Sequence, residues 1–368
     1  MKKNTDIWLT TILALFVLFS VLIALLLGPD TDTPDTDTNA DSSTESRYDS
    51  TDSDTDTTET ESDSSASDGT DSADSSDETK DTDETVPDSD TNADSRPVDI
   101  DSLPDYDKDS LGISGGYTPD QSLTDALANA IAVFDRPVSF LAVDLKSGIS
   151  LSYNVGDKYS AASMVKASFA YYVCHEIDAG NASLNEKLTY TAADTVYADN
   201  VIGKAGIGKE YTLYQVLYYT IVSSDNEGYY MLLRRFGRDG YDAMMSSIGC
   251  PTLSVSGTRW PDTSAIDMVK LWQKIYAYKD ETANGKMLYE LFEQVEYMNF
   301  IERALGVPVV NKAGWNSSIF NDCGVVSGEN STYILAIFSK GNYFTAVKSQ
   351  FYDIIRAVDA LMNDSASK

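Results

Sequence analysis

Apolar residues follow three different patterns along the chain. Residues 7–27 (IWLTTILALFVLFSVLIALLL) form one uncharged apolar run, and residues 28–115 are a low-complexity stretch rich in Asp, Ser and Thr. Only residues 116–368 show the spacings of about 3.6 and 2 residues that are typical of amphipathic helices and strands. The pattern therefore predicts an apolar segment, a linker without a core and one folded domain.

Helices and strands are predicted at both ends of the folded region, on either side of a mainly helical middle. Residues 122–135 have helical periodicity, and 138–144 and 149–153 form a predicted hairpin. The middle of the chain is mainly helical. Further strands are expected at 307–312, 324–327 and 332–338, and a last helix at 344–362. This order predicts a mixed α/β (α+β) fold, with one antiparallel sheet, flanking terminal helices and an inserted helical region.

The apolar run 7–27 is long enough to cross a membrane, which needs about 20 apolar residues. Lys2 and Lys3 precede it and an acidic stretch follows, so the positive-inside bias places the folded domain outside the cytoplasm. A cleaved signal peptide is the alternative, but its apolar stretch is usually shorter and ends in small residues, whereas Gly28-Pro-Asp follows here. We expect a single-pass anchor in the cell membrane.

The acidity of the chain is concentrated in the linker. Residues 28–110 hold 29 acidic and four basic residues, a net charge of -25, and residues 1–27 carry +1. Of the total of -31, only -7 therefore belongs to residues 111–368. A solvated, self-repelling spacer is expected for 28–115, in preference to metal binding by its Thr-Asp repeats. No nucleic-acid partner is expected.

Ser163 and Lys166 are three residues apart in residues 159–173 (YSAASMVKASFAYYV), where a largely apolar helix is expected to begin. Residues three apart share a helical face, so the lysine amine is expected over the serine hydroxyl. A lysine can accept the serine proton if part of it is neutral, which burial and nearby positive charge promote. Alternatively, its ammonium reaches water. Spacing alone does not decide, because Ser365 and Lys368 match the same pattern.

Histidine is the usual base for a serine nucleophile. The one histidine of the chain, His175, follows Ser163 by twelve residues, about 18 Å along a continuous helix. This separation excludes a Ser-His-Asp triad that uses Ser163.

Two later segments complete an ordered set of motifs. Ser224-Asp225-Asn226 and Lys312-Ala313-Gly314 follow Ser163-Met-Val-Lys166. Taken singly, Ser-Asp-Asn is also a helix cap and Lys-Ala-Gly an ordinary strand end. In this order and at this spacing, the three segments resemble the motifs of the penicillin-recognising serine enzymes, in particular the class A beta-lactamases. The resemblance covers residues 122–362 and implies a beta-lactamase/DD-peptidase-like fold.

The resemblance implies catalytic roles for the first two motifs. Ser163 would be the nucleophile and Lys166 its base or proton relay. Ser224 would pass a proton to the leaving nitrogen. Asn226 would hold both Lys166 and an amide of the substrate, whereas Asp225 is expected to be structural.

The third motif would bind the substrate. Lys312, followed by Ala313 and Gly314, would supply positive charge for a substrate carboxylate and help keep the catalytic lysine neutral. The oxyanion hole would consist of the backbone N–H groups of Ser163 and Trp315.

Two departures from the family pattern change the expected chemistry. Ala313 replaces a hydroxyl residue, and a lost hydrogen bond to a charged group costs about 1.5 to 3 kcal/mol unless Asn316 or Ser317 supplies it. Residues 243–260 contain no Asp or Glu, although class A enzymes carry a deacylating glutamate in the loop after the second motif. The loop also looks short. Glu227 is the nearest carboxylate in sequence and is expected to point along its own helix.

The sequence predicts an active-site serine hydrolase or acyltransferase that forms an acyl-enzyme and deacylates slowly. Its expected partners are beta-lactams or peptidoglycan stem peptides ending in D-alanyl-D-alanine. The alternative is a penicillin-binding or sensing domain that does not turn over. No cofactor and no metal are expected, because Cys174, Cys250 and Cys323 have no metal-ligand spacing and the odd count leaves at least one thiol free.

Overall fold

The computed structural model describes residue 100 and residues 108–296, 299–341 and 345–368. The predicted membrane span at 7–27 and most of the predicted linker lie outside these residues. Within the described ranges, no helix has both the length and the apolar character needed to cross a membrane.

The centre of the domain is an antiparallel sheet. Its strands follow the order β1-β3-β2-β11-β10-β8, with β9 also paired to β10. Every residue of β2 is buried, since helices cover both faces of the sheet, and five of its seven residues are apolar. The strands are β1 (Gly112–Ser114), β2 (Val138–Asp144), β3 (Ser150–Tyr153), β8 (Val309–Asn311), β9 (Gly314–Trp315), β10 (Phe320–Ser327) and β11 (Thr332–Ser339).

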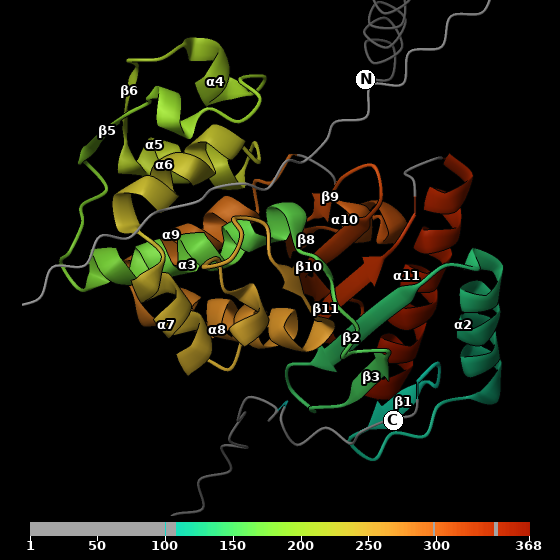
Figure 1. Ribbon diagram of the computed structural model, residues 1–368. Helices are drawn as coiled ribbons and strands as arrows, with labels where there is room; N and C mark the ends of the chain where they lie inside the picture. The colour runs from blue at the N-terminus through green and yellow to red at the C-terminus, as the bar shows by residue number, and fades with distance from the viewer. Residues whose placement is uncertain (1–99, 101–107, 297–298, 342–344) are drawn as a thin grey trace, which may run out of the picture. The chain divides into compact units, whose positions relative to one another are not determined.

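The helices from the two ends of the domain pack together on one face of the sheet (Figure 1). They are α2 (Gln121–Phe134) and α11 (Thr345–Ala366). Asp120 caps α2 by accepting a hydrogen bond from the Ser122 backbone N–H at 2.9 Å. Together with the sheet and α10 (Phe300–Leu305), they enclose an aromatic core in which Phe320 and Phe351 lie 4.8 Å apart between ring centroids.

A helical region is inserted between β3 and β8. Its longest helix, α8, covers the second face of the sheet through contacts with β2, β10 and β11. Its helices are α3 (Val165–Asp178), α4 (Val201–Ala205), α5 (Leu213–Ile221), α6 (Asn226–Phe236), α7 (Asp239–Ser247), α8 (Ala265–Glu281), α9 (Ala283–Phe292) and α10 (Phe300–Leu305). Short elements complete it: β4 (Tyr159–Ser160), β5 (Lys187–Thr189), β6 (Glu210–Thr212), β7 (Asp262–Thr263) and the 3-10 turns η2 (Ala162–Met164), η3 (Ala192–Asp194) and η4 (Pro251–Leu253).

The predicted fold class is confirmed: terminal helices flank an antiparallel sheet with a helical insertion. The largest difference in element length is at β10, which begins at Phe320, whereas the sequence indicated a strand from 324. The segment 320–323 (FNDC) places two polar residues, Asn321 and Asp322, in the sheet. Both are buried, and both accept hydrogen bonds that the sequence pattern does not reveal.

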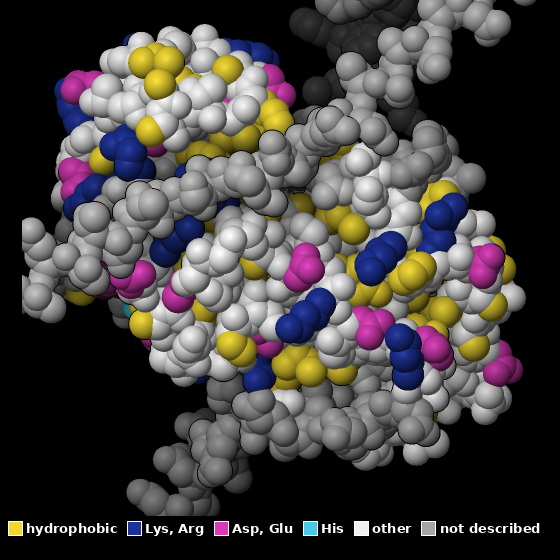
Figure 2. All heavy atoms as spheres, in the orientation of Figure 1, with side chains coloured by type: hydrophobic (Ala, Val, Ile, Leu, Met, Phe, Trp, Pro, Cys, Tyr) yellow, Lys and Arg dark blue, Asp and Glu magenta, His cyan; other side chains and the backbone are white. Residues whose placement is uncertain are grey.

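Opposite charges are interspersed on the face of the domain shown in Figure 2, where Lys and Arg side chains alternate with Asp and Glu. This distribution agrees with the modest net charge of residues 111–368. The three cysteines, Cys174, Cys250 and Cys323, are all buried and free.

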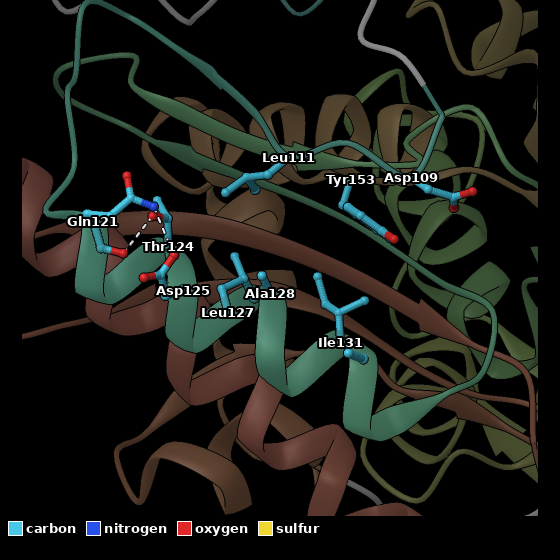
Figure 3. Close-up of a pocket in the computed structure, with 10 residues that line it drawn as sticks. Asp109, Leu111, Gln121, Thr124, Asp125, Leu127, Ala128, Ile131 and Tyr153 are labelled. Atoms are coloured by element: carbon cyan, nitrogen blue, oxygen red, sulfur yellow. Dashed lines mark hydrogen bonds between the residues drawn. The ribbon is translucent and has the colours of Figure 1, made fainter.

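A hollow of about 460 Å³ lies between α2 and the strand edge formed by β3 and the segment before β1 (Figure 3). Leu127 and Ile131 point from α2 toward Leu111 and Tyr153. At its rim, Gln121 donates a hydrogen bond to Asp125 Oδ1 at 2.8 Å. The residues that line this hollow include none of the three motifs.

Candidate active site

Ser163 lies in a tight turn that leads from β4 into α3. Ala162 has a φ of 43°, which is uncommon for a residue with a side chain, and begins the 3-10 turn that carries Ser163. The turn is fixed from behind because the Ala161 N–H donates to the Pro261 carbonyl at 2.8 Å. The nucleophile of the sequence prediction therefore lies at the start of a buried helix with its side chain only partly covered.

The Lys166 amine lies at the centre of the cluster. Its Nζ is 3.1 Å from Ser163 Oγ and 2.7 Å from Asn226 Oδ1, and it also contacts Ser224 through the carbonyl at 2.7 Å and Oγ at 3.3 Å. Lys166 is fully buried. Burial lowers its pKa well below the usual range and the charge of Lys312 lowers it further, against the opposing effect of two nearby carboxylates.

Ser224 joins the two lysines. Its Oγ accepts a hydrogen bond from Lys312 Nζ at 3.0 Å in addition to the contact with Lys166. Ser224 has a φ of 53°, so the chain turns sharply between α5 and α6 and directs this hydroxyl inward. The next residue, Asp225, caps α6 by accepting from the Gly228 N–H and also accepts from the Ile202 N–H, each at 2.9 Å, which is the structural position expected for it.

Lys312 follows β8 and is almost completely buried. Burial lowers its pKa to about 8, although the nearby Asp322 carboxylate acts in the opposite direction. Asp322 is itself buried, which raises its pKa to about 6, and both of its oxygens accept from the Asn311 side-chain amide. Lys312 therefore lies near a buried amide and a buried carboxylate.

Gly314 allows β9 to approach the nucleophile. A Cβ atom at this position would lie 2.3 Å from the Ala161 carbonyl oxygen, so any side chain would push the two segments apart. The neighbouring Trp315, whose backbone is the predicted oxyanion donor, is consequently beside the turn that holds Ser163. Ala313 is buried and brings no hydroxyl. Asn316 Oδ1 accepts from the backbone of its own loop, at Ser318 and Ile319.

A cleft of about 670 Å³ opens at this cluster. Ser163, Ser224 and Asn226 contribute to its inner wall. Tyr197, Asp199, Asn200, Val201, Lys204, Ser223, Glu296 and Trp315 line the rest. The serine is therefore accessible from the outside, whereas Lys166 is not among the lining residues.

The position of Glu227 differs from expectation. Instead of pointing along its own helix, the side chain is buried, and its Oε1 accepts backbone N–H groups from Val196, Tyr197 and Ala198 at 2.8 to 3.1 Å. Burial alone would raise the pKa of Glu227, but these donors more than compensate and lower it. The carboxylate holds the loop at the rim of the cleft and is a poor base.

Two features of the site had no clear signal in the sequence. The Trp260 ring centroid lies 5.5 Å from Lys166 Nζ. The anchoring of residues 196–198 by Glu227 is the second.

His175 lies at the far end of α3, where its ring stacks on Tyr278 with centroids 4.2 Å apart. The described residues contain no group of three or more His, Cys, Asp or Glu side chains arranged to hold a metal ion.

The chain resembles known proteins in both sequence and structure. A family described as the Beta-lactamase enzyme family matches residues 122–363. A beta-lactamase from Sphaerobacter thermophilus is 23% identical, with 65% of this chain and 97% of that chain covered and a TM-score of 0.58. The structure of PBP-A is 20% identical, with 65% of this chain and 96% of that chain covered and a TM-score of 0.58. A beta-lactamase from Chitinophaga pinensis is 18% identical, with 65% of this chain and 99% of that chain covered and a TM-score of 0.59. A search of curated proteins gave no match.

Proposed function

Because the chain belongs to the Beta-lactamase enzyme family, we propose that it is a serine hydrolase in which Ser163 is acylated by beta-lactams. One observation carries the proposal. Ser163, Lys166, Ser224 and Lys312 form an unbroken chain of contacts of 3.0 to 3.3 Å between their functional atoms. A chain of this kind can move a proton from the nucleophile to the leaving group.

The proposed acylation follows this chain. Neutral Lys166 takes the proton of Ser163 Oγ while the oxygen attacks the lactam carbonyl carbon and its C–N bond breaks. The developing oxyanion accepts hydrogen bonds from the backbone N–H groups of Ser163 and Trp315. Ser224 delivers a proton to the departing nitrogen and regains one from Lys166. The positive charge of Lys312 attracts the substrate carboxylate.

We propose substrates that combine an amide with an adjacent carboxylate. Beta-lactams and the D-alanyl-D-alanine ends of cell-wall peptides share this arrangement. A mutant of PBP-A, 20% identical to this chain, is known as a penicillin G acyl-enzyme complex, and this supports beta-lactams as the first substrates to test.

The acyl-enzyme is expected to form quickly and hydrolyse slowly. Residues 243–260 carry no carboxylate, and Glu227 is engaged with three backbone N–H groups. The absence of a general base typically slows a step by about a hundred- to ten-thousandfold. With a chromogenic cephalosporin, we expect a burst of about one product per enzyme followed by slow turnover.

Mass spectrometry of the full-length protein after mixing with penicillin gives the same test without a chromophore. A mass increase of one acyl group that persists for many minutes supports the proposal. Rapid linear turnover without a burst, lost in Glu227→Gln, contradicts slow deacylation and makes that carboxylate the base. A burst with no later turnover favours the alternative, a penicillin-binding sensor, because such a domain is acylated once and stays acylated.

We also propose that residues 7–27 anchor the chain in the cell membrane with the hydrolase domain outside the cytoplasm. The proposal rests on the uncharged run and on Lys2 and Lys3 before it. Protease added to intact cells stripped of their wall is expected to cut within the acidic linker and release the domain. Protection until the cells are lysed means the opposite orientation. Mature protein in the medium means a cleaved signal.

A further inference from the structure

An aromatic ring lies next to the Lys166 amine. Ser163, Ser224 and Asn226 supply the oxygen contacts of its Nζ, and the Trp260 ring centroid lies 5.5 Å from the same atom. Lys166 has no exposed surface. The indole therefore takes the place that solvent would otherwise occupy next to the amine.

The Trp260 backbone is held directly behind the nucleophile. Pro261, the next residue, accepts the hydrogen bond from the Ala161 N–H, and β7 then pairs with β4, which leads to Ser163. These contacts fix the chain immediately after Trp260 against the turn that carries Ser163.

Aromatic neighbours hold the ring itself. Its centroid lies 5.2 Å from that of Tyr229 and 6.3 Å from that of Tyr230. Tyr229 is buried and donates to the Arg259 carbonyl at 3.0 Å, while the Arg259 guanidinium lies over the Tyr230 ring. The residues that line the substrate cleft include neither Lys166 nor Trp260. The ring therefore contacts the amine without forming part of the cleft wall.

This arrangement determines where water can approach an acylated Ser163. Hydrolysis requires a water oxygen to bond to the acyl carbon, a base to take its proton, and Ser163 Oγ to leave with a proton as the carboxylic acid departs. Lys166 is the one amine or carboxylate group in hydrogen-bonding distance of Ser163 Oγ among the described residues. A water that uses this base must lie beside Nζ, where the Trp260 ring stands.

We propose that Trp260 is a positioning residue that closes the lysine side of the acyl-enzyme to water and thereby sets the lifetime of the acyl group. This inference rests on the proposed acylation of Ser163. Slow hydrolysis then has two causes. Residues 243–260 lack a carboxylate that could act as a base, and the Trp260 ring keeps water away from Lys166.

The test measures acylation and deacylation separately in full-length protein with a fluorescent penicillin. Trp260→Ala opens the space beside the amine and is expected to shorten the acyl half-life by about a hundredfold, the lower end of the contribution of a positioned base. Trp260→Phe retains an aromatic cover and is expected to stay within about threefold of the unmodified protein. Arg259→Ala, which alters the exposed neighbour and leaves the indole in place, is the matched control.

A second apolar variant separates water access from loss of structure. Trp260→Leu keeps an apolar but smaller side chain at this position, and its acyl half-life is expected to fall between those of the Ala and Phe variants. Deacylation in Trp260→Ala is also expected to rise with pH as Lys166 loses its proton, a dependence that simple loosening of the loop does not produce.

Three results overturn the inference. The first is an unchanged acyl half-life in both Trp260→Ala and Trp260→Leu with normal acylation. The second is an equal shortening in Trp260→Phe and Arg259→Ala, which makes loop mobility the cause. The third is unmodified protein that takes no label, which contradicts the proposed function and this inference with it, whereas the first two leave the proposed function intact.

Discussion

Replacing Ser163 with alanine is expected to abolish covalent labelling by a fluorescent penicillin. The substitution removes the only atom of the cluster that becomes bonded to the acyl group, so the expected loss is complete. The Ser163 side chain is partly exposed in the cleft, and its removal leaves the folded core unchanged. Labelling is measured by gel fluorescence and by the mass of the intact protein.

The chain contains its own control for this experiment. Ser365 also precedes a lysine by three residues, but its Oγ donates to the Met362 carbonyl within the last helix, far along the sequence from the other motifs. Ser365→Ala is expected to label normally. Labelling that survives Ser163→Ala, or an acylated peptide that contains a different serine, disproves the assignment.

Replacing Lys166 with alanine is expected to slow acylation by about a hundred- to ten-thousandfold, the usual contribution of a general base. Lys166→Met, which fills more of the buried space without an amine, is expected to show a similar loss. A thermal melt close to that of the unmodified protein separates lost chemistry from lost structure. An unaltered acylation rate in both variants means that the lysine takes no part in proton transfer.

The pH profile of acylation identifies the two lysines individually. Lys166 acts as a base only when neutral, so acylation falls as the pH drops through its lowered pKa. Lys312 attracts a carboxylate only when charged, so acylation also falls as the pH rises above about 8. Lys312→Arg keeps its charge and is expected to move the alkaline limb upward. An alkaline limb that does not move shows that another group titrates there.

The central elements of the fold were predictable because their burial leaves a local pattern. β2 is buried on both faces and its residues 140–143 are all apolar, and α2 repeats its apolar residues at helical spacing. The convergence of the site has no local pattern. Lys166 and Ser224 are 58 residues apart and Ser224 and Lys312 are 88 apart. Only the resemblance of the ordered motifs indicated that they meet.

Other parts of the site could not be predicted for specific physical reasons. Ala162 and Ser224 adopt positive φ values that their residue types rarely show, so sequence propensity indicates neither turn. Trp260 looks like an ordinary core residue, because an aromatic side chain in a short connection is usually packing. Glu227 was expected to point along its own helix, and only the three-dimensional path of residues 196–198 shows why its carboxylate is buried.

The three buried cysteines make the fold independent of the redox potential around it. Burial raises the pKa of the Cys174 and Cys323 thiols, and it raises that of Cys250 to about 12. The thiolate is the form that is oxidised, alkylated or exchanged, and it is scarce at all three positions at neutral pH. Since no disulfide joins these residues, neither an oxidising nor a reducing environment adds or removes a covalent link. The domain keeps the same cross-link-free architecture on either side of a membrane.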